Sequence, residues 1–392
     1  MNKKQIIGIV LFIVLIALIV GIKAVKDRGI IGGDESSKLN TVYVATGGGK
    51  EGFIQDEKVV SIIEEQYGLN VVYDSWSNGK FITAPMVREF VNKGNTNISK
   101  DKLSINNEAC SRYDAMFCSD QRFYDYYKLA PKNDEAERYS VKNGGLMLNT
   151  PIVIYSWAKV TDALIAENIV TEKDGVYYIT DMNKLIDYIL QEKKWSDIGL
   201  SELYGTVNVA STDPVTSSPG ATYYGLLLSI LSNGDINDEN INANLEKLKQ
   251  YYNKSGYMNN TPADLFERYL KTGVGGEPII VDYEKSLIEF AIANPDGYNQ
   301  VKDNMVVLYP KPTMWNTHCF AVFSENGKKL YKALQDPEIQ KIAWEKYGYR
   351  TGFTGAEYSA ETLGVNVPKT LTSTVTTLKY DYYNKLREYL SN

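Results

Sequence analysis

The sequence predicts an α/β protein with parallel sheets, preceded by one membrane-spanning segment. Three observations lead to this class. The 392-residue chain is 44% hydrophobic and 23% charged, a globular composition that excludes wholesale disorder. Short apolar runs alternate with segments of helical periodicity, which is the pattern of βαβ units. One run of 17 residues near the start contains no charge. The length is sufficient for two domains with substantial cores.

The uncharged run occupies residues 6–22, at the short end for a transmembrane helix. No small-x-small cleavage site follows it, and the first cysteine, Cys110, lies too far along for lipid attachment. We therefore expect an uncleaved single-pass anchor in residues 1–28 and a polar tether in residues 29–39. Basic residues flank the run on both sides, so charge alone does not orient it. The favoured topology leaves a very short cytoplasmic N-terminus and places the folded part outside the cell membrane.

The first folded segment predicts a βαβ unit. Residues 41–45 are typical of a buried strand and run into a glycine loop at residues 46–50. Residues 56–67 have apolar residues at helical spacing, and Gly68 follows as a C-terminal stop. Residues 69–73 predict the next strand. Consecutive strands joined by a helix pair in parallel, so a parallel sheet follows.

The remainder of the chain continues this alternation. Further strands are predicted at residues 113–118, 151–155, 206–210, 278–281, 305–309 and 319–323. Helices are predicted at residues 162–167, 182–191, 221–231, 263–270, 284–293, 327–334 and 337–347, with a loop at residues 272–276 and a terminal helix within residues 371–392.

Two loops between a strand and a helix carry a binding signal. In residues 46–50, glycines let backbone amides approach a ligand, although the spacing fits neither a Walker loop nor a dinucleotide fingerprint. In residues 216–220, Ser218 is a good N-cap and Pro219 suits the first helical position, which leaves amides and hydroxyls for an anion or polar ligand. Ligands bind at the carboxyl ends of strands in open α/β sheets. A plain loop and a helix cap without ligand remain alternatives.

Composition excludes several functions. Acidic residues number 48 and basic residues 42, so the basic surplus of a nucleic-acid binder is absent. The single histidine, His318, cannot form a multi-histidine zinc site, and its neighbour Cys319 points to the opposite face of a strand. We expect no metal, no cofactor and no enzymatic activity. Cys110 and Cys118 would lie roughly 26 Å apart if extended, which is too far for a disulfide.

Several segments, taken in order, carry a family resemblance. They read YVATGGG, YDAMFCSD, VNVASTDPVTSSPGATYYGLLL, GVGGEPIIVDYEKSL and PEIQKIAWEKYGYRTGF. Together they resemble extracellular solute-binding proteins of the type II periplasmic-binding fold, and look closest to the molybdate, sulfate and phosphate-like branches. The resemblance spans about residues 39–353. It departs from the family at the first loop, where oxyanion binders often have serine and this chain has glycine.

The resemblance implies two Rossmann-like α/β lobes, joined by two hinge crossings, that close on a ligand. Lobe 1 would comprise residues 40–150 and 310–392, and lobe 2 residues 151–309. The implied partners are a small molecule or oxyanion and an ABC-type permease. Asp120 would repel a fully ionised oxyanion unless it accepted a proton from the ligand. Carried over by position, the ligand contacts would be Gly47, Gly48, Gly49, Ser119, Asp120, Thr216, Ser217, Ser218 and Tyr283.

The sequence therefore favours a membrane-tethered solute-binding protein without catalytic activity. The main alternative is a membrane-anchored interaction or sensory subunit that uses the same fold to bind a protein. A hydrolase or transferase is disfavoured because the motifs supply no combined nucleophile, base and orienting group. Arg122 and Arg350 could pair with an anion, but ordinary salt bridges are the simpler interpretation. Ligand identity and oligomeric state stay open.

Overall fold

The computed structural model describes residues 39–76, 113–127, 141, 143–351 and 365–392. The predicted anchor in residues 1–28 and the predicted tether before Leu39 lie outside the described residues, as does Cys110. Within the described ranges, no helix is both long and apolar enough to cross a bilayer. Cys118 and Cys319 are buried and form no disulfide with each other.

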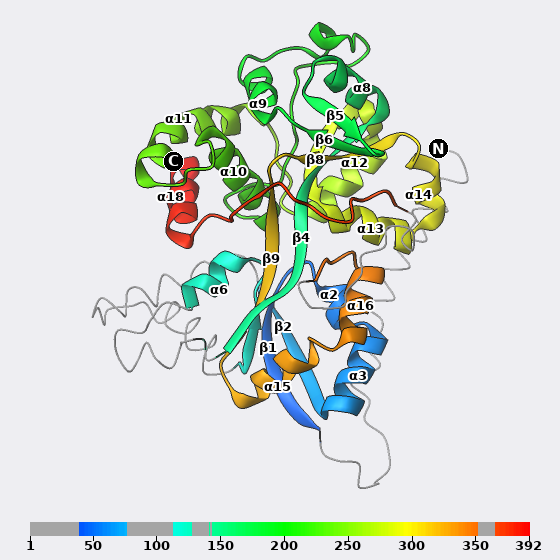
Figure 1. Cartoon of the computed structure of the whole chain (residues 1–392), viewed down its shortest axis with the longest axis vertical. Coiled ribbons are helices and arrows are strands. Elements are labelled where there is room, and N and C mark those ends of the chain that lie inside the picture. Colours follow the sequence, from blue (N-terminus) through cyan, green and yellow to red (C-terminus); the bar gives the residue numbers. More distant parts are fainter. Residues whose placement is uncertain (1–38, 77–112, 128–140, 142, 352–364) are drawn as a thin grey trace. The chain divides into compact units, whose positions relative to one another are not determined.

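Strands and helices alternate along the described chain (Figure 1). The strands are β1 (Asn40–Gly47), β2 (Leu69–Trp76), β3 (Ala115–Phe117), β4 (Asn143–Trp157), β5 (Val170–Lys173), β6 (Val176–Ile179), β7 (Ile279–Tyr283), β8 (Met305–Pro310), β9 (Thr313–Val322) and β10 (Thr374–Val375). The helices are α2 (Glu51–Ile54), α3 (Glu57–Tyr67), α6 (Gln121–Tyr127), α8 (Ala158–Ala166), α9 (Met182–Leu190), the 3₁₀ helix η2 (Trp195–Ile198), α10 (Ser218–Leu231), α11 (Asp238–Lys254), α12 (Pro262–Gly276), α13 (Glu284–Ala293), α14 (Pro295–Val301), α15 (Glu325–Ala333), α16 (Pro337–Glu345) and α18 (Tyr380–Ser391).

The predicted βαβ unit is present at the start of the described chain. β1 pairs in parallel with β2 on one side and with β3 on the other. Asp56 begins α3 by accepting hydrogen bonds from two backbone amides, and Gly68 ends the helix with a left-handed φ of 66°. The carboxyl ends of β1 and β3 therefore lie at the same edge of the sheet.

Two long antiparallel strands connect this sheet to a second one. The first half of β4 pairs with β9, and its second half pairs with β7 and β8. The resulting order is β2-β1-β3-β9-β4-β8-β6-β5, with β7 on β4 and β10 on β9 (Figure 1). β4 thus pairs with both sheets, and β9 follows β8 of the second sheet closely in the chain and pairs with the first.

Each sheet has its own hydrophobic core. The core around β1 and β3 includes Val44, Phe117 and Phe320, with α3, α15 and α16 packed on it. The larger core around β4, β7 and β8 includes Ile154 and most of α10, which is buried over almost its whole length. A smaller cluster with Met116 and Phe123 also packs on the sheet of β1 and β3. Because the clusters of the two sheets are separate, we treat the two parts as two lobes.

Three sequence predictions differ from the structure. Residues 206–210 form isolated bridges rather than a regular strand: Thr206 pairs with Lys194, and Ala210 exchanges backbone hydrogen bonds with β7. Residues 272–276, predicted as a loop, continue α12 beyond a kink at Gly273, where φ is 62°. The C-terminal residues of α18 belong to the core of lobe 2, whereas residues 310–392 were assigned to lobe 1. The sequence predicts the apolar face of α18, but it does not indicate which surface that face packs against.

The docking of α18 gives a stability prediction. Leu386 on α18 is 1% exposed and belongs to the lobe 2 core, whereas Leu146 on β4 is 39% exposed. We expect Leu386→Ala to lower the free energy of unfolding by about 2–5 kcal/mol, because it removes buried methyl groups and leaves a cavity. Leu146→Ala is the matched control and should cost less than about 1 kcal/mol. Urea denaturation of both variants measures the difference, and equal losses would contradict the packing of α18.

Candidate functional site

The loops after β1 and β3 touch one another. A Cβ atom at Gly47 would lie 2.7 Å from Cβ of Ser119, closer than such atoms approach in proteins. Position 47 must therefore be glycine if the loop after β3 is to approach β1 this closely. Gly48 and Gly49 follow and are exposed. The structure thus brings together the predicted residues of both loops.

The N-terminus of α10 meets the same place from lobe 2. Oγ of Ser218 lies 3.5 Å from Oγ of Ser119, and both residues are buried. Ser217 is the N-cap residue but makes no side-chain capping bond. Thr216 is the exposed member of this loop, and its hydroxyl contacts Asp213 at 3.4 Å. Of the predicted residues in this segment, Ser218 is the one that is observed to contact the other lobe, through Ser119.

Tyr283 completes the predicted set from the end of β7. Its side chain is buried, with 5% exposed, and its hydroxyl has no hydrogen-bond partner among the described residues. Burial raises the pKa of Tyr283 well above its usual value, and the negative charges of Asp120 and Asp282 add to this rise. An unpartnered buried hydroxyl beside the β3 loop is a group that a ligand could satisfy.

Asp120 is already neutralised by its neighbour Arg122. It accepts hydrogen bonds from the Arg122 amide at 2.9 Å, from Nε at 2.7 Å, and from Nη2. Burial acts to lower the pKa of Arg122, but the charge and hydrogen bonds of Asp120, together with the electrostatic influence of Tyr383 and Tyr283, more than offset this effect. The guanidinium also stacks over Tyr383 of α18 at 4.1 Å. An anion in the cleft would therefore not meet an unpaired carboxylate at Asp120. Arg350 is likewise occupied, by Glu284.

Sequence reasoning missed three residues that join these loops. Asn316 Nδ2 lies 3.0 Å from the Ser119 carbonyl and 3.2 Å from Nε2 of His318. Nδ1 of His318 lies 3.3 Å from Nζ of Lys50, which also reaches the Gly47 carbonyl at 2.8 Å. All three side chains are buried. The available signal was the position of Lys50 directly after the glycines and the i, i+2 spacing of Asn316 and His318 on one strand.

The electrostatics of this network are unusual. Burial, together with the charge of Lys285, lowers the pKa of Lys50 to about 7. Burial, followed by the charges of Lys50 and Lys285, lowers the pKa of His318 well below its usual value, so the ring is neutral at pH 7. Within the described residues, no group of three His, Cys, Asp or Glu side chains could hold a metal ion. The hydrogen-bond donors of the site are therefore mainly uncharged groups.

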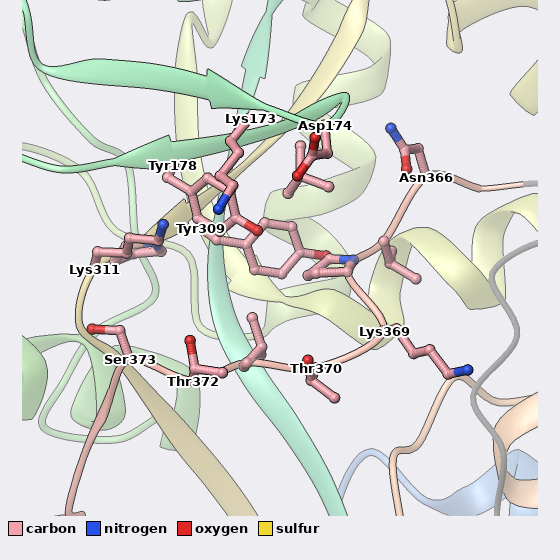
Figure 2. Close-up of a pocket in the computed structure, with 15 residues that line it drawn as sticks. Lys173, Asp174, Tyr178, Tyr309, Lys311, Asn366, Lys369, Thr370, Thr372 and Ser373 are labelled. Carbon is pink, nitrogen blue, oxygen red and sulfur yellow. The ribbon is translucent and has the colours of Figure 1, made fainter.

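A separate pocket of about 400 Å³ lies away from these residues. Figure 2 shows Lys173, Tyr178 and Tyr309 on one side of it and the segment 366–373 on the other. None of the predicted ligand residues lines it. Its link to the site is the Tyr309 hydroxyl, which donates to Glu284 at 2.7 Å, directly after Tyr283 in the chain.

Solved structures identify the architecture. Neither a family model nor a curated protein matches this sequence. A structure of an extracellular solute-binding protein from Bordetella parapertussis aligns with a TM-score of 0.56 and 14% identity, over 90% of this chain and 97% of that one. A periplasmic thiamin binding protein aligns with a TM-score of 0.53 and 13% identity, over 93% and 100% of the two chains. This chain has the fold of these solute-binding proteins.

The expected type II periplasmic-binding fold is thereby confirmed. A ferric binding protein from Campylobacter jejuni aligns similarly, with a TM-score of 0.52 and 13% identity over 89% of this chain and 97% of that one. The names of the last two proteins specify thiamin and ferric ligands. The fold is therefore shared by proteins with different ligands, and the choice of ligand must be argued from the side chains and amides of this site.

The contact between Gly47 and Ser119 gives a second prediction. Gly47→Ala forces the β3 loop away and should lower the free energy of unfolding by about 1–3 kcal/mol. Gly275→Ala is the control, because a Cβ there meets nothing within 4 Å and the backbone is not left-handed. Denaturation midpoints of the two variants provide the measurement. A Gly47→Ala variant as stable as the control would show that the loops are not tightly apposed.

Proposed function

We propose that this protein is a membrane-tethered extracytoplasmic solute-binding protein that captures a small anion, most favourably an oxyanion, between its two lobes. Residues 6–22 anchor it, and an ABC-type permease receives the ligand. The protein does no chemistry on what it binds. This function agrees with the fold, with the apolar N-terminal run, and with the donors that surround the cleft.

The observation that carries the proposal is the surplus of hydrogen-bond donors without acceptors. The Tyr283 hydroxyl is buried and unpartnered, and the amides of Gly48 and Gly49 have no acceptor among the described residues. The nearby carboxylate of Asp120 is consumed by Arg122. A ligand rich in acceptor oxygens would satisfy these donors.

Closure of the lobes explains how affinity would arise. Ser119 belongs to lobe 1 and Ser218 to lobe 2, and their hydroxyls meet at 3.5 Å. A ligand bound beside this pair of hydroxyls exchanges its hydration shell for amides and hydroxyls from both lobes. The start of α10 at Ser218 adds the positive end of a 14-residue helix. The permease would recognise the closed form.

A thermal-shift screen of the full chain in detergent tests this function. The panel contains molybdate, tungstate, sulfate and phosphate, with amino acids and sugars for comparison. A ligand at about 100 times its Kd should stabilise the folded state by about 2.7 kcal/mol. Ser218→Ala should reduce the shift, and Ser229→Ala, a buried serine further along the same helix, is the control. If no compound shifts ligand-free protein, a protein-binding sensory role takes its place.

Tyr283 gives a prediction in which stability and affinity change in opposite directions. Tyr283→Phe removes an unsatisfied buried hydroxyl, so the ligand-free protein should gain up to about 1 kcal/mol of stability. Binding of the oxyanion found in the screen should weaken by about 10- to 100-fold, because a hydrogen bond to a charged group is lost. Tyr309→Phe is the control and should destabilise the protein, since its hydroxyl bonds to buried Glu284. A loss of stability in Tyr283→Phe would contradict the assignment.

The anchor gives a prediction about location. The full chain should stay with membranes through an alkaline wash, and protease added to intact cells should digest the folded part. Leu15→Asp at the middle of the apolar run should release the protein, because a central charge disfavours insertion by about 2.5–3.5 kcal/mol. Lys26→Asp, outside the run, is the control. Release of the unaltered chain by the wash would show that residues 6–22 do not anchor it.

A further inference from the structure

The carbonyl groups of the glycine loop are all turned toward the protein interior. Nζ of Lys50 lies 2.8 Å from the Gly47 carbonyl oxygen and 3.4 Å from that of Gly48, and the Tyr349 hydroxyl donates to the Gly49 carbonyl. In a planar trans peptide, a carbonyl oxygen and the following amide hydrogen point in opposite directions. The amides of Gly48 and Gly49 therefore point away from Lys50, toward solvent. We call these two N–H groups the amide cradle, since successive amides of this kind bind anions.

The amine of Lys50 forms no ion pair with a described acidic residue, although the charge of the adjacent Glu51 acts on it. Lys50 is 1% exposed, and its three polar contacts are two carbonyl oxygens and a ring nitrogen. No ion pair between described residues includes it. A buried ammonium ion without a counterion is strongly disfavoured and tends to lose its proton instead.

The hydrogen bonds around His318 indicate the protonation state of Lys50. Nδ2 of Asn316 donates to the Ser119 carbonyl, while its Oδ1 accepts from Thr222 at 3.4 Å, so Nδ2 is the atom that faces His318. An amide nitrogen only donates, so Nε2 of His318 accepts and the ring proton lies on Nδ1. That proton points at Nζ of Lys50, 3.3 Å away.

A neutral amine satisfies this arrangement completely. Its lone pair accepts from Nδ1–H of His318, and its two hydrogens serve the carbonyls of Gly47 and Gly48. An ammonium group has no lone pair and would require the other histidine tautomer, whose Nε2–H would face the donor Nδ2 of Asn316. The network is therefore complete only when Lys50 is uncharged.

We propose that Lys50 is uncharged in the ligand-free cleft and takes up one proton from solvent when an anion occupies the amide cradle. The inference rests on the proposed function and deepens it. The anion and the Lys50 amine lie on opposite sides of the peptide groups that join Gly47, Gly48 and Gly49. Over this separation, in a partly buried site, the charge of the anion still stabilises a charge on Lys50. Lys50 is thus a positioning residue that orients the cradle, and its proton offsets the charge of the ligand.

The other groups that face Lys50 do not provide this proton. Glu51 on α2 acts to raise the pKa of Lys50, and Lys285 on α13 acts to lower it. Lys285 is paired with Glu289 at 2.6 Å. Burial raises the pKa of Cys118, directly after β3, to about 12. Burial also lowers the pKa of His318 and raises that of Tyr349, in both cases away from neutrality. Asp282 is the competing candidate, because burial raises its pKa to about 7.

Calorimetry on the unaltered full chain tests the proton uptake. The probe is the oxyanion that gives the largest shift in the screen, titrated at pH 8 in two buffers of different ionisation enthalpy. We expect uptake of up to one proton, and an affinity that falls by as much as tenfold per pH unit above about pH 7. The sign follows because the anion favours the protonated amine, which becomes scarcer as the pH rises. A flat affinity from pH 6 to 9 without uptake would overturn this inference but leave the proposed function intact.

Variants assign the proton to a residue. Lys50→Met should abolish both the uptake and the pH dependence, Lys58→Met on the surface of α3 should change neither, and Asp282→Asn should retain both. Uptake that is lost in Asp282→Asn or kept in Lys50→Met would overturn the assignment. Absence of oxyanion binding by the unaltered protein at every pH would instead refute the proposed function.

The single histidine allows a direct readout that does not depend on folding of a variant. His318 is the only histidine of the chain, so ¹⁵N-histidine labelling gives an unambiguous signal from its two ring nitrogens. We expect the Nδ1–H tautomer in ligand-free protein at pH 8 and a shift toward Nε2–H when the oxyanion is added. An Nε2–H tautomer in the ligand-free protein would overturn the inference.

Discussion

The pairing of β4 with β9 is the constraint on which the rest of the structure depends. β4 pairs with strands of both sheets, and β9 places Asn316 and His318 opposite Thr150 and Leu148 of β4. The hydrogen bonds of Asn316 reach Ser119 in lobe 1 and Thr222 on α10 in lobe 2. The connection between the lobes and the floor of the site are therefore formed by the same few residues. A change in the angle between the lobes must alter the surroundings of Asn316.

The charges of the site are balanced before any ligand arrives. Asp120 is paired with Arg122, and Glu284 with Arg350, and each of these four side chains is buried. Both pairs hold their atoms in a fixed geometry, because removal of one member would leave the other as an unpaired buried charge. Backbone amides and hydroxyls then supply uncharged donors to a ligand. A site of this type discriminates by the number and direction of acceptors rather than by a fixed charge.

Local features were predictable from the sequence, whereas the contacts between distant residues were not. The βαβ unit followed from the apolar spacing of residues 56–67 and from Gly68, and the position of the glycine loop followed from the parallel sheet. The link between Lys50 and His318 joins residues 268 positions apart, so no local pattern reveals it. The docking of α18 on lobe 2 was hidden for the same reason. The pairing of Asp120 with Arg122 spans two positions, but its strength depends on burial, which the sequence does not report.

The position of Asn316 connects ligand capture to lobe closure through hydrogen-bond direction. While its Nδ2 serves Ser119 and His318, the imidazole keeps its proton on Nδ1 and Lys50 stays neutral. Protonation of Lys50 reverses the imidazole and places two donors face to face at Asn316. That conflict is relieved only if the Asn316 amide turns or moves, which breaks its bonds to Ser119 and to Thr222 of α10. Because Ser119 and α10 belong to different lobes, the charge state of Lys50 and the contact between the lobes are coupled by one side chain.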